Sequence, residues 1–312
     1  MTRDGDATDP SLLALVGPTA TGKTDAAIAV AERLGAEIVS VDSMLVYRGM
    51  DVGTAKPTAE QRSRVPHHLI DVAEPSEPFS VARYQALARE AIAGVRGRGR
   101  RPLLVGGTAL YLRAIADDLE LPPTDPGVRS ALEAEAGRVG AAELYERLAR
   151  SDPVAAAKIE PANVRRTVRA LEVAQLTGRP FSSFAPAWER FDPSRLRAAG
   201  IRLPRVRLAE RIRDRVAHML ELGLLDEVAG LVERGFGDWL TASQAIGYAE
   251  FARHLAGELT LEEAVAGTVR RTTALARRQV AFLRRDPRIR WFEPDAGGAE
   301  RIVDEIAEHL DG

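Results

Sequence analysis

The amino-acid sequence predicts an α/β protein in which a doubly wound parallel sheet carries an inserted all-helical domain. Two observations lead to this fold class. Over residues 12–118, runs typical of β-strands alternate with helical patterns, as in parallel sheets with helices on both faces. Between about residues 126 and 178, in contrast, only helical signals occur. Ligands of such sheets bind at the carboxyl ends of the strands, so residues there are the first candidates for function.

The first predicted strand, LLALV, leads into a loop whose pattern is typical of phosphate binding. It matches G-x-x-x-x-G-K-S/T at Gly17, Gly22, Lys23 and Thr24, and a helical pattern follows at residues 25–34. This P-loop predicts a P-loop NTPase-like core, in which backbone N–H groups, the lysine and the positive end of a helix hold phosphates. The threonine offers its hydroxyl to Mg²⁺, so we expect Mg²⁺ as cofactor and Thr24 as its ligand. ATP and a prenyl diphosphate both fit the motif, because both carry a pyrophosphate.

Two further strands are predicted to end beside this loop. Residues 36–42 alternate and are rich in β-branched side chains, so they form a second strand that ends on Asp42. Residues 102–105 form a buried strand that runs into a Gly-Gly-Thr turn, and Thr108 opens a helix to about residue 116. Because parallel strands end at one edge of a sheet, Asp42 and Thr108 are expected near the phosphates.

The run LELPPTD at residues 119–125 interrupts this alternation. Asp125 is placed to cap a helix with Pro126 in its first turn, and Pro161 is placed to open a helix that ends at Gly178. We therefore predict an inserted helical domain at residues 119–190 and a P-loop core at residues 1–118 and 191–312.

Strand and helix patterns resume after the insertion. Residues 201–203 are predicted to return to the sheet, and long helices follow to about residue 285. A last strand is expected near residues 289–292, with a terminal helix behind it. These elements complete the core that the first 118 residues begin.

The composition indicates a globular chain: it has 312 residues, of which 45% are hydrophobic and 28% charged. Because cysteine is absent, disulfides, cysteine-ligated zinc and thiol nucleophiles are excluded. The N-terminal segment is acidic and polar, unlike a secretory signal, and no apolar run approaches the roughly 20 residues that span a bilayer. We therefore expect a cytoplasmic protein, a monomer, without a membrane partner.

The basic residues are distributed unevenly, although the net charge is only −2. Arginine is the usual base, and lysine occurs only at Lys23, Lys56 and Lys158. This usage hints that the first two positions require a compact ammonium instead of a planar guanidinium.

Two helices carry basic faces opposite apolar ones. In the helix opening at Pro161, a step of about 100° per residue separates an apolar stripe from three arginines. The stripe is Val164, Val168 and Leu171, and the arginines are Arg165, Arg166 and Arg169. In the helix at residues 264–285, the arginines are Arg270, Arg271, Arg277, Arg278, Arg284 and Arg285, and the apolar side is Val269, Leu275, Phe282 and Leu283. Such a face is commonly only solvated, but the scarcity of acids in the second helix favours a polyanion such as RNA.

Seven motifs, taken in order, closely resemble the bacterial tRNA dimethylallyltransferases over nearly the whole chain. They are GPTATGKT (17–24), DSMLVYRGMDVGTAKP (42–57), PHHLID (66–71), VGGTALYLRA (105–114), RRTVRALEV (165–173), QAIGY (244–248) and RRQVAFLR (277–284). The resemblance implies transfer of a dimethylallyl group from its diphosphate to N6 of the adenosine 3′ of the anticodon, position 37, in tRNAs that read codons beginning with U.

The resemblance also implies roles for single residues. Asp42 matches the family's general base, and Thr108 matches its hydroxyl partner on the adenine side. Lys23 and Arg215, the latter by its match to the family's R-F-x-x-M segment, complete the catalytic set. The diphosphate site implied is Gly17, Pro18, Thr19, Ala20, Thr21, Gly22, Lys23, Thr24 and Arg215.

On the RNA side, the family's motifs coincide with the basic helical faces. The implied partner is the tRNA anticodon stem-loop, and the insertion at residues 119–190 is expected to close over it. The matching positions are Asp42, Ser43, Met44, Leu45, Thr108, Arg129, Arg165, Arg166, Thr167, Val168, Arg169, Gln244, Ala245, Ile246, Gly247, Tyr248, Ala249, Arg277, Arg278, Gln279 and Arg284.

Alternatives remain for the main residues. Asp42 could be only a magnesium ligand, Thr108 a helix cap, and Arg215 half of a surface ion pair. The rival functions are a P-loop kinase or ATPase, a prenyltransferase acting on free AMP or ATP, and an RNA-binding protein with a degenerate P-loop.

The chain departs from the family pattern at several positions. The usual His-Pro-Asn-Asp is Glu160-Pro161-Ala162-Asn163, the usual Lys-Arg-Gln begins with Arg277, and the usual tryptophan is Phe282. The first departure affects the insertion's expected tRNA contacts. None of them falls on the P-loop, Asp42, Thr108 or Arg215.

Overall fold

The computed structural model describes residues 12–294 and 302–312, and the chain divides into two compact units. One comprises Met1–Asp117 and Asp192–Gly312, and the other comprises Asp118–Phe191. These limits lie within one or two residues of the predicted boundaries. No helix of the described residues is long and apolar enough to cross a membrane.

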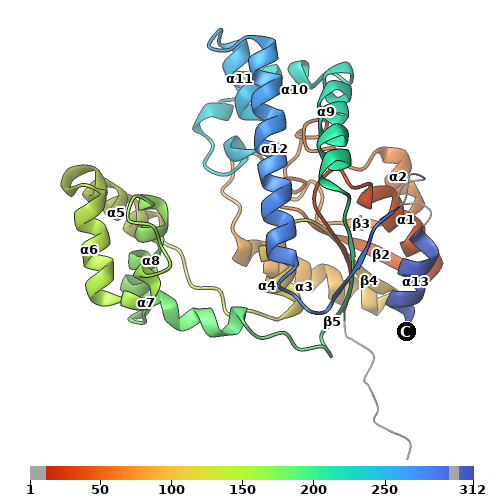
Figure 1. Cartoon of the computed structure of the whole chain (residues 1–312), viewed down its shortest axis with the longest axis horizontal. Helices are drawn as coiled ribbons and strands as arrows, with labels where there is room; N and C mark the ends of the chain where they lie inside the picture. Colours follow the sequence, from red (N-terminus) through yellow and green to blue (C-terminus); the bar gives the residue numbers. More distant parts are fainter. Residues whose placement is uncertain (1–11, 295–301) are drawn as a thin grey trace, which may run out of the picture. The chain divides into compact units, whose positions relative to one another are not determined.

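The larger unit is built on a six-stranded parallel sheet, which agrees with the predicted fold class (Figure 1). The strands are β1 (Leu12–Val16), β2 (Ala36–Val41), β3 (His67–His68), β4 (Arg101–Gly106), β5 (Leu196–Ile201) and β6 (Ile289–Phe292). Their order is β3-β2-β4-β1-β5-β6, so β1 lies between β4 and β5. The apolar run of β1 is buried on both faces because it occupies this central position.

Helices cover both faces of the sheet. They are α1 (Lys23–Leu34), α2 (Ala59–Arg64), α3 (Val81–Gly97), α4 (Ala109–Ala116), α9 (Arg205–Glu221), α10 (Leu224–Glu233), α11 (Tyr248–Leu255), α12 (Leu261–Leu283) and α13 (Val303–Asp311), with short 3₁₀ turns at Phe236–Asp238 and Ala242–Gln244. One apolar core joins α1 and α13 to the sheet, and a larger one joins the opposite face to α3, α4 and apolar residues of α9–α12. Successive strands and helices thus form a doubly wound core.

The smaller unit is all-helical. Its elements are α5 (Pro126–Val139), α6 (Ala141–Ser151), α7 (Pro153–Ala156), α8 (Val164–Thr177) and a 3₁₀ segment, Phe181–Trp188. Leu132, Leu144, Leu148 and Leu171 belong to a core of its own. Asp125 accepts a hydrogen bond from the Val128 amide, so it caps α5 as predicted.

The structure corrects the fifth strand. The prediction placed it at residues 201–203, but β5 spans Leu196–Ile201. Its Ala-Ala-Gly centre has low intrinsic β-propensity, yet the sheet accepts it because small residues fit between β1 and β6. A Cβ atom at Gly200 would lie 2.7 Å from the Trp291 ring. Tertiary packing, which a local pattern does not contain, therefore decides this strand.

Helix starts are corrected by their capping residues. The helix predicted to open at Pro161 begins at Val164, because the Asn163 side chain accepts the Arg166 amide. The helix predicted from residue 264 begins at Leu261, where Thr260 and Glu263 form a capping box. The apolar face of α12 is also narrower than predicted, because Phe282, which the sequence pattern assigns to that face, is 40% exposed.

Candidate active site

The P-loop joins β1 to α1, and its backbone accounts for both glycines of the motif. Gly17 has φ +151°, and a Cβ atom there would lie 2.3 Å from the Ile201 carbonyl oxygen. Gly22 has φ 84°, in the left-handed region that favours glycine, and it is the N-cap of α1. The helix begins directly with Lys23, so its positive end faces the loop. The loop thus has the geometry of an anion cradle.

Lys23 carries a charge without an ionic partner. Its Nζ donates a hydrogen bond to the Pro18 carbonyl at 2.5 Å, and among the described residues no carboxylate forms an ion pair with it. Removal from water and the nearby positive charge of Arg215 lower the pKa of Lys23 to about 7, although Asp42 acts in the opposite direction. An anion in the loop would supply the missing counter-charge.

Asp42 and Thr108 lie at the ends of adjacent strands, as expected. β2 ends at Val41 and β4 at Gly106, and these two residues are paired in the sheet. Asp42 Oδ1 accepts the Met44 amide at 2.9 Å, while the Thr108 hydroxyl accepts the Ser43 amide at 3.2 Å. Thr108 makes no side-chain cap to α4. Thr108 therefore occupies the N-cap position of α4, but its hydroxyl is used for the residue next to Asp42 and not for a capping hydrogen bond.

Arg215 and Gln279 contact the P-loop from two distant helices. Arg215 of α9 donates to the Thr19 hydroxyl at 3.2 Å, and Gln279 of α12 accepts the Thr19 amide at 3.0 Å. A Cβ atom on Gly107 would lie 2.4 Å from Gln279 Nε2. Burial lowers the pKa of Arg215, and no carboxylate in the described part of the chain forms an ion pair with it. The surface ion-pair alternative for Arg215 is therefore wrong.

Two adjoining cavities meet at these residues. The larger has a volume of about 380 Å³ and the smaller about 90 Å³. Both are lined by Thr19, Asp42, Thr54, Arg215 and Gln279. Asp42, Lys23 of the P-loop and Arg215 of α9 therefore border the smaller cavity together, and Asp42 and Arg215 also border the larger one.

The smaller cavity suits a hydrated Mg²⁺ ion next to a bound anion. It is lined by Lys23, Thr24 and Ser40, and the buried Ser40 hydroxyl has no hydrogen-bond partner among the described residues. Mg²⁺ is commonly held by one or two protein oxygens, several waters and substrate phosphates. The donor set therefore fits magnesium bound mainly through a ligand, with Thr24 as the protein contribution.

Many predicted RNA-side residues also line the larger cavity. They are Asp42, Ser43, Met44, Gln244, Ala245, Ile246, Gly247, Tyr248, Arg278 and Gln279. Leu45 lines the smaller cavity. Ala249 is half-buried on α11, and Arg165, Arg166, Arg277 and Arg284 are exposed.

Four predicted positions of the smaller unit are engaged within that unit. Thr167 and Val168 are each 1% exposed, so their side chains pack inside it. Arg129 and Arg169 both pair with Glu172, and Arg169 also donates to the Pro122 and Pro123 carbonyls. The prediction that Arg169 faces outward is wrong, because Glu172, buried on the same helix, binds its guanidinium.

The basic face of α12 is likewise interrupted. Arg271 pairs with Glu250 of α11, an acid outside the segment in which the sequence showed few acids. The neighbouring arginines 270, 277, 278, 284 and 285 are exposed. The sequence alone did not mark Glu250, because its partner lies on another helix, or Glu172, which pairs with Arg169 of its own helix and also with Arg129 of α5.

Sequence comparison identifies the family. The model of the IPP transferase family matches residues 45–286, and that of isopentenyl transferase matches residues 10–71. A tRNA dimethylallyltransferase of Desulforudis audaxviator is 48% identical over 305 residues, covering 96% of this chain and 98% of the relative. One of Streptomyces coelicolor is 50% identical over 293 residues, covering 94% and 92%.

Solved structures agree with this relationship. The tRNA isopentenylpyrophosphate transferase of Bacillus halodurans is 42% identical, with a TM-score of 0.69 and 97% of both chains covered. A eukaryotic dimethylallyltransferase acting on tRNA is 26% identical, with a TM-score of 0.73, covering 91% of this chain and 74% of its own. The chain belongs to the tRNA dimethylallyltransferase family.

Proposed function

We propose that the protein transfers a dimethylallyl group from dimethylallyl diphosphate to the exocyclic N6 of an adenosine in tRNA, at position 37 beside the anticodon of tRNAs that read codons beginning with U. One observation carries the proposal: Asp42 and the uncompensated charges of Lys23 and Arg215 border the same cavity. Relatives with this name cover nearly the whole chain. The site thus combines a proton acceptor with an anion cradle.

The transfer requires a base at the adenine. N6 attacks C1 of the allyl group, the C1–O bond to the diphosphate breaks, and the N6 proton must leave. We assign this proton to Asp42, a carboxylate that follows the end of β2 and accepts the Met44 amide. A positioned general base contributes about 10²–10⁴-fold to such a step.

The leaving group requires positive charge. Negative charge grows on the diphosphate as the C1–O bond breaks, and preorganised donors there lower the barrier. Lys23, Arg215 and the P-loop amides are the donors that this chain supplies. Thr24 would hold Mg²⁺, which when bound would supply further charge neutralisation at the leaving group.

The central experiment incubates the protein with radiolabelled dimethylallyl diphosphate and unmodified tRNA. Label should enter tRNA, and nuclease digestion should place it on the adenosine 3′ of the anticodon. AMP and ATP, supplied as competing acceptors, should remain unlabelled. Labelling of a free nucleotide, or hydrolysis of ATP without transfer, would instead support one of the rival P-loop activities.

Asp42→Asn tests the base. The substitution keeps the shape of the side chain but removes its proton affinity, so the single-turnover rate should fall at least about 10²-fold. tRNA binding, measured by filter retention, should change little. Rates are measured at saturating donor, tRNA and Mg²⁺. A near-parental rate under these conditions would return Asp42 to the role of magnesium ligand. In that case the variant should instead bind the donor more weakly, and extra Mg²⁺ should largely restore this binding.

A further inference from the structure

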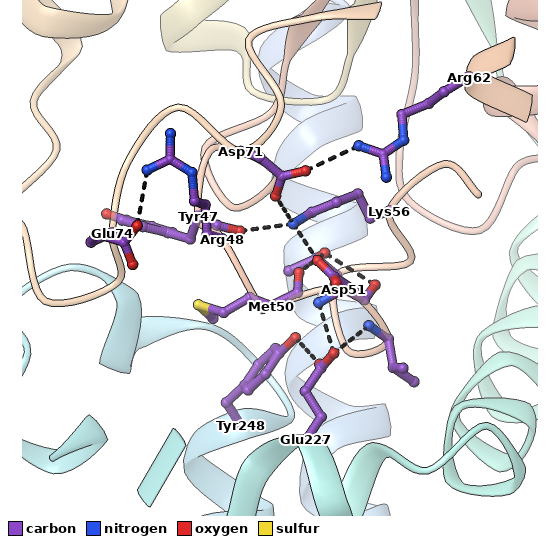
Figure 2. Close-up of polar contacts among 12 residues, drawn as sticks. Tyr47, Arg48, Met50, Asp51, Lys56, Arg62, Asp71, Glu74, Glu227 and Tyr248 are labelled. Atoms are coloured by element: carbon purple, nitrogen blue, oxygen red, sulfur yellow. Dashed lines mark hydrogen bonds and ion pairs between the residues drawn. The ribbon is translucent and has the colours of Figure 1, made fainter. Parts of the chain in front are cut away.

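Three consecutive backbone amides converge on one carboxylate outside the predicted site. The amides of Asp51 and Val52 both donate to Glu227 Oε2 at 2.8 Å, and the Gly53 amide donates to Oε1 at 3.0 Å (Figure 2). Glu227 lies on α10, more than 170 positions further along the chain. A row of amides that point the same way is an anion-binding arrangement, and here a side chain of the protein occupies it.

The same carboxylate also holds an aromatic side chain. The hydroxyl of Tyr248, the first residue of α11, donates to Glu227 Oε1 at 2.5 Å. A Cβ atom on Gly53 would lie 2.5 Å from the Tyr248 ring, so this glycine lets the backbone rest directly on the ring. Glu227 therefore joins the segment after β2 to α11 through four hydrogen bonds that it accepts.

The joined segment is a wall of the reaction space. Gly53 and Tyr248 line the 380 Å³ cavity that Asp42 and Arg215 border. Asp51 and Val52 line an outer cavity of about 890 Å³, which shares Arg215 and Met219 with the inner one. The turn at residues 51–53 therefore contributes lining to both cavities.

We propose that Glu227 is a positioning residue for prenyl transfer, because it fixes the turn at residues 51–53 and the Tyr248 ring as one rigid wall of the cavity that Asp42 borders. The inference rests on the proposed function. Its physical basis is preorganisation, since reacting groups held about 1 Å out of place can lose about 10²-fold in rate. Glu227 acts through this wall and does not itself touch a reacting atom.

Only a carboxylate satisfies this arrangement. Each of the three amides is an obligatory donor, so the group that they face must accept through both of its oxygens. Glutamine at this position would present one oxygen and one NH₂ group, and the NH₂ group would face at least one amide hydrogen. Glu227→Gln therefore loosens the turn while it preserves size.

The test compares Glu227→Gln with Asp226→Asn, a matched loss of charge on the neighbouring exposed residue of the same helix. In Glu227→Gln, amide hydrogen exchange of a peptide covering residues 51–54 should accelerate at least about 10-fold, while β1 and β4 keep their protection. The single-turnover rate at saturating substrates should fall about 10- to 100-fold. The tRNA dissociation constant should stay within about 2-fold, and Asp226→Asn should match the parent in every measurement.

Tyr248→Phe provides a second, milder variant. It removes one hydrogen bond and leaves the ring, so the rate should fall about 2- to 10-fold, in keeping with the net value of a single hydrogen bond. This variant decides the matter if Glu227→Gln does not fold. A parental rate in either folded variant, or exchange that accelerates throughout the sheet, overturns the positioning role. A parent protein that transfers nothing to tRNA overturns the proposed function, and the positioning role falls with it.

Discussion

Lys23 and Lys56 are both withdrawn from bulk solvent in the larger unit, but their surroundings differ. Among the described residues, Lys23 Nζ donates only to the Pro18 carbonyl, and the nearby positive charge of Arg215 lowers its pKa. Lys56 Nζ donates to the Tyr47 carbonyl at 2.8 Å and to Asp51 and Asp71 at 2.5 Å each (Figure 2). Within residues 12–294 and 302–312, no carboxylate therefore pairs with Lys23, whereas two pair with Lys56.

The difference indicates that the charge of Lys23 is available to bind an anion, whereas the charge of Lys56 stabilises the fold. A buried ion whose hydrogen bonds and charge are already satisfied has little left to offer a ligand, whereas an uncompensated ion gains free energy when an anion arrives. Lys56 closes the turn that begins at Asp51, since its own amide donates to the Asp51 carbonyl at 2.9 Å. Both lysines use a compact ammonium, as the scarcity of lysine hinted, but for these two different purposes.

The largest expected effect comes from making Lys56 resemble Lys23. The double substitution Asp51→Asn and Asp71→Asn keeps the shape of both side chains and leaves the ammonium, whose side chain is 2% exposed, without a carboxylate. Breaking a pair in which both ions are buried costs about 3–5 kcal/mol, and we expect a loss toward the lower end because the Asp51 and Asp71 side chains are 59% and 31% exposed. Urea unfolding should show this loss, and adding Lys56→Met should recover part of it. An unchanged free energy of unfolding would mean that the carboxylates do not compensate Lys56.

Lys23→Met tests the opposite case. The single-turnover transfer rate should fall about 10²-fold or more, because a preorganised charge at the leaving group is lost. Stability should increase, since the folded-state pKa of about 7 lies below the ordinary value of 10.5. The folded state therefore binds less proton than the unfolded state between these values, and stability rises with pH there. The gain from Lys23→Met should be fully present below pH 7 and should shrink toward pH 10.5.

Donor binding should take up a proton at Lys23. In the protein without donor, the pKa of Lys23 is about 7, so the side chain is mostly neutral at pH 8.5. A bound diphosphate favours the charged form of this side chain. Affinity for the donor should therefore fall as pH rises above 7, by at most about tenfold per unit. Calorimetry of diphosphate binding in two buffers of different ionisation enthalpy measures the proton uptake. Lys23→Met should abolish it, and uptake that survives this substitution would point to another group.

The smallest effects concern the arginines, where the same distinction applies. Arg277 on α12 is exposed, whereas Arg169 on α8 is bound by Glu172 and two backbone carbonyls. Arg277→Gln should reduce the slope of the logarithm of the tRNA binding constant against the logarithm of salt concentration by roughly one unit. The stability of the protein should change little. Arg169→Gln should change that slope less and should destabilise the smaller unit. tRNA titrations at several salt concentrations measure the slopes, and thermal melts measure the stability of each variant. Equal slopes for the two variants would contradict the difference expected between Arg277 and Arg169.

Local patterns were sufficient for much of the site. The P-loop was predictable because Gly17 and Gly22 occupy backbone conformations that other residues avoid, and such requirements leave a mark in the sequence. Asp42 and Thr108 were predictable because strand ends are visible as changes of pattern, and parallel strands share one edge. The limits of the inserted domain were visible for a similar reason, since proline and capping residues mark helix starts.

What the tertiary structure alone decided is the set of partners for each charge. Arg169 and Arg271 belong to basic faces in the sequence, yet both are paired. Arg271 is paired with Glu250, which the fold brings from another helix, and Arg169 shares the buried Glu172 of its own helix with Arg129 of α5. Glu227 belongs to none of the motifs in the sequence. It accepts three backbone amides only because α10 lies against the turn at residues 51–53. By itself, the sequence determined which residues are able to carry charge, make a P-loop and end a strand. Whether a charge is satisfied depends on groups many positions away, because electrostatic and hydrogen-bond energies follow distance in space and not separation along the chain.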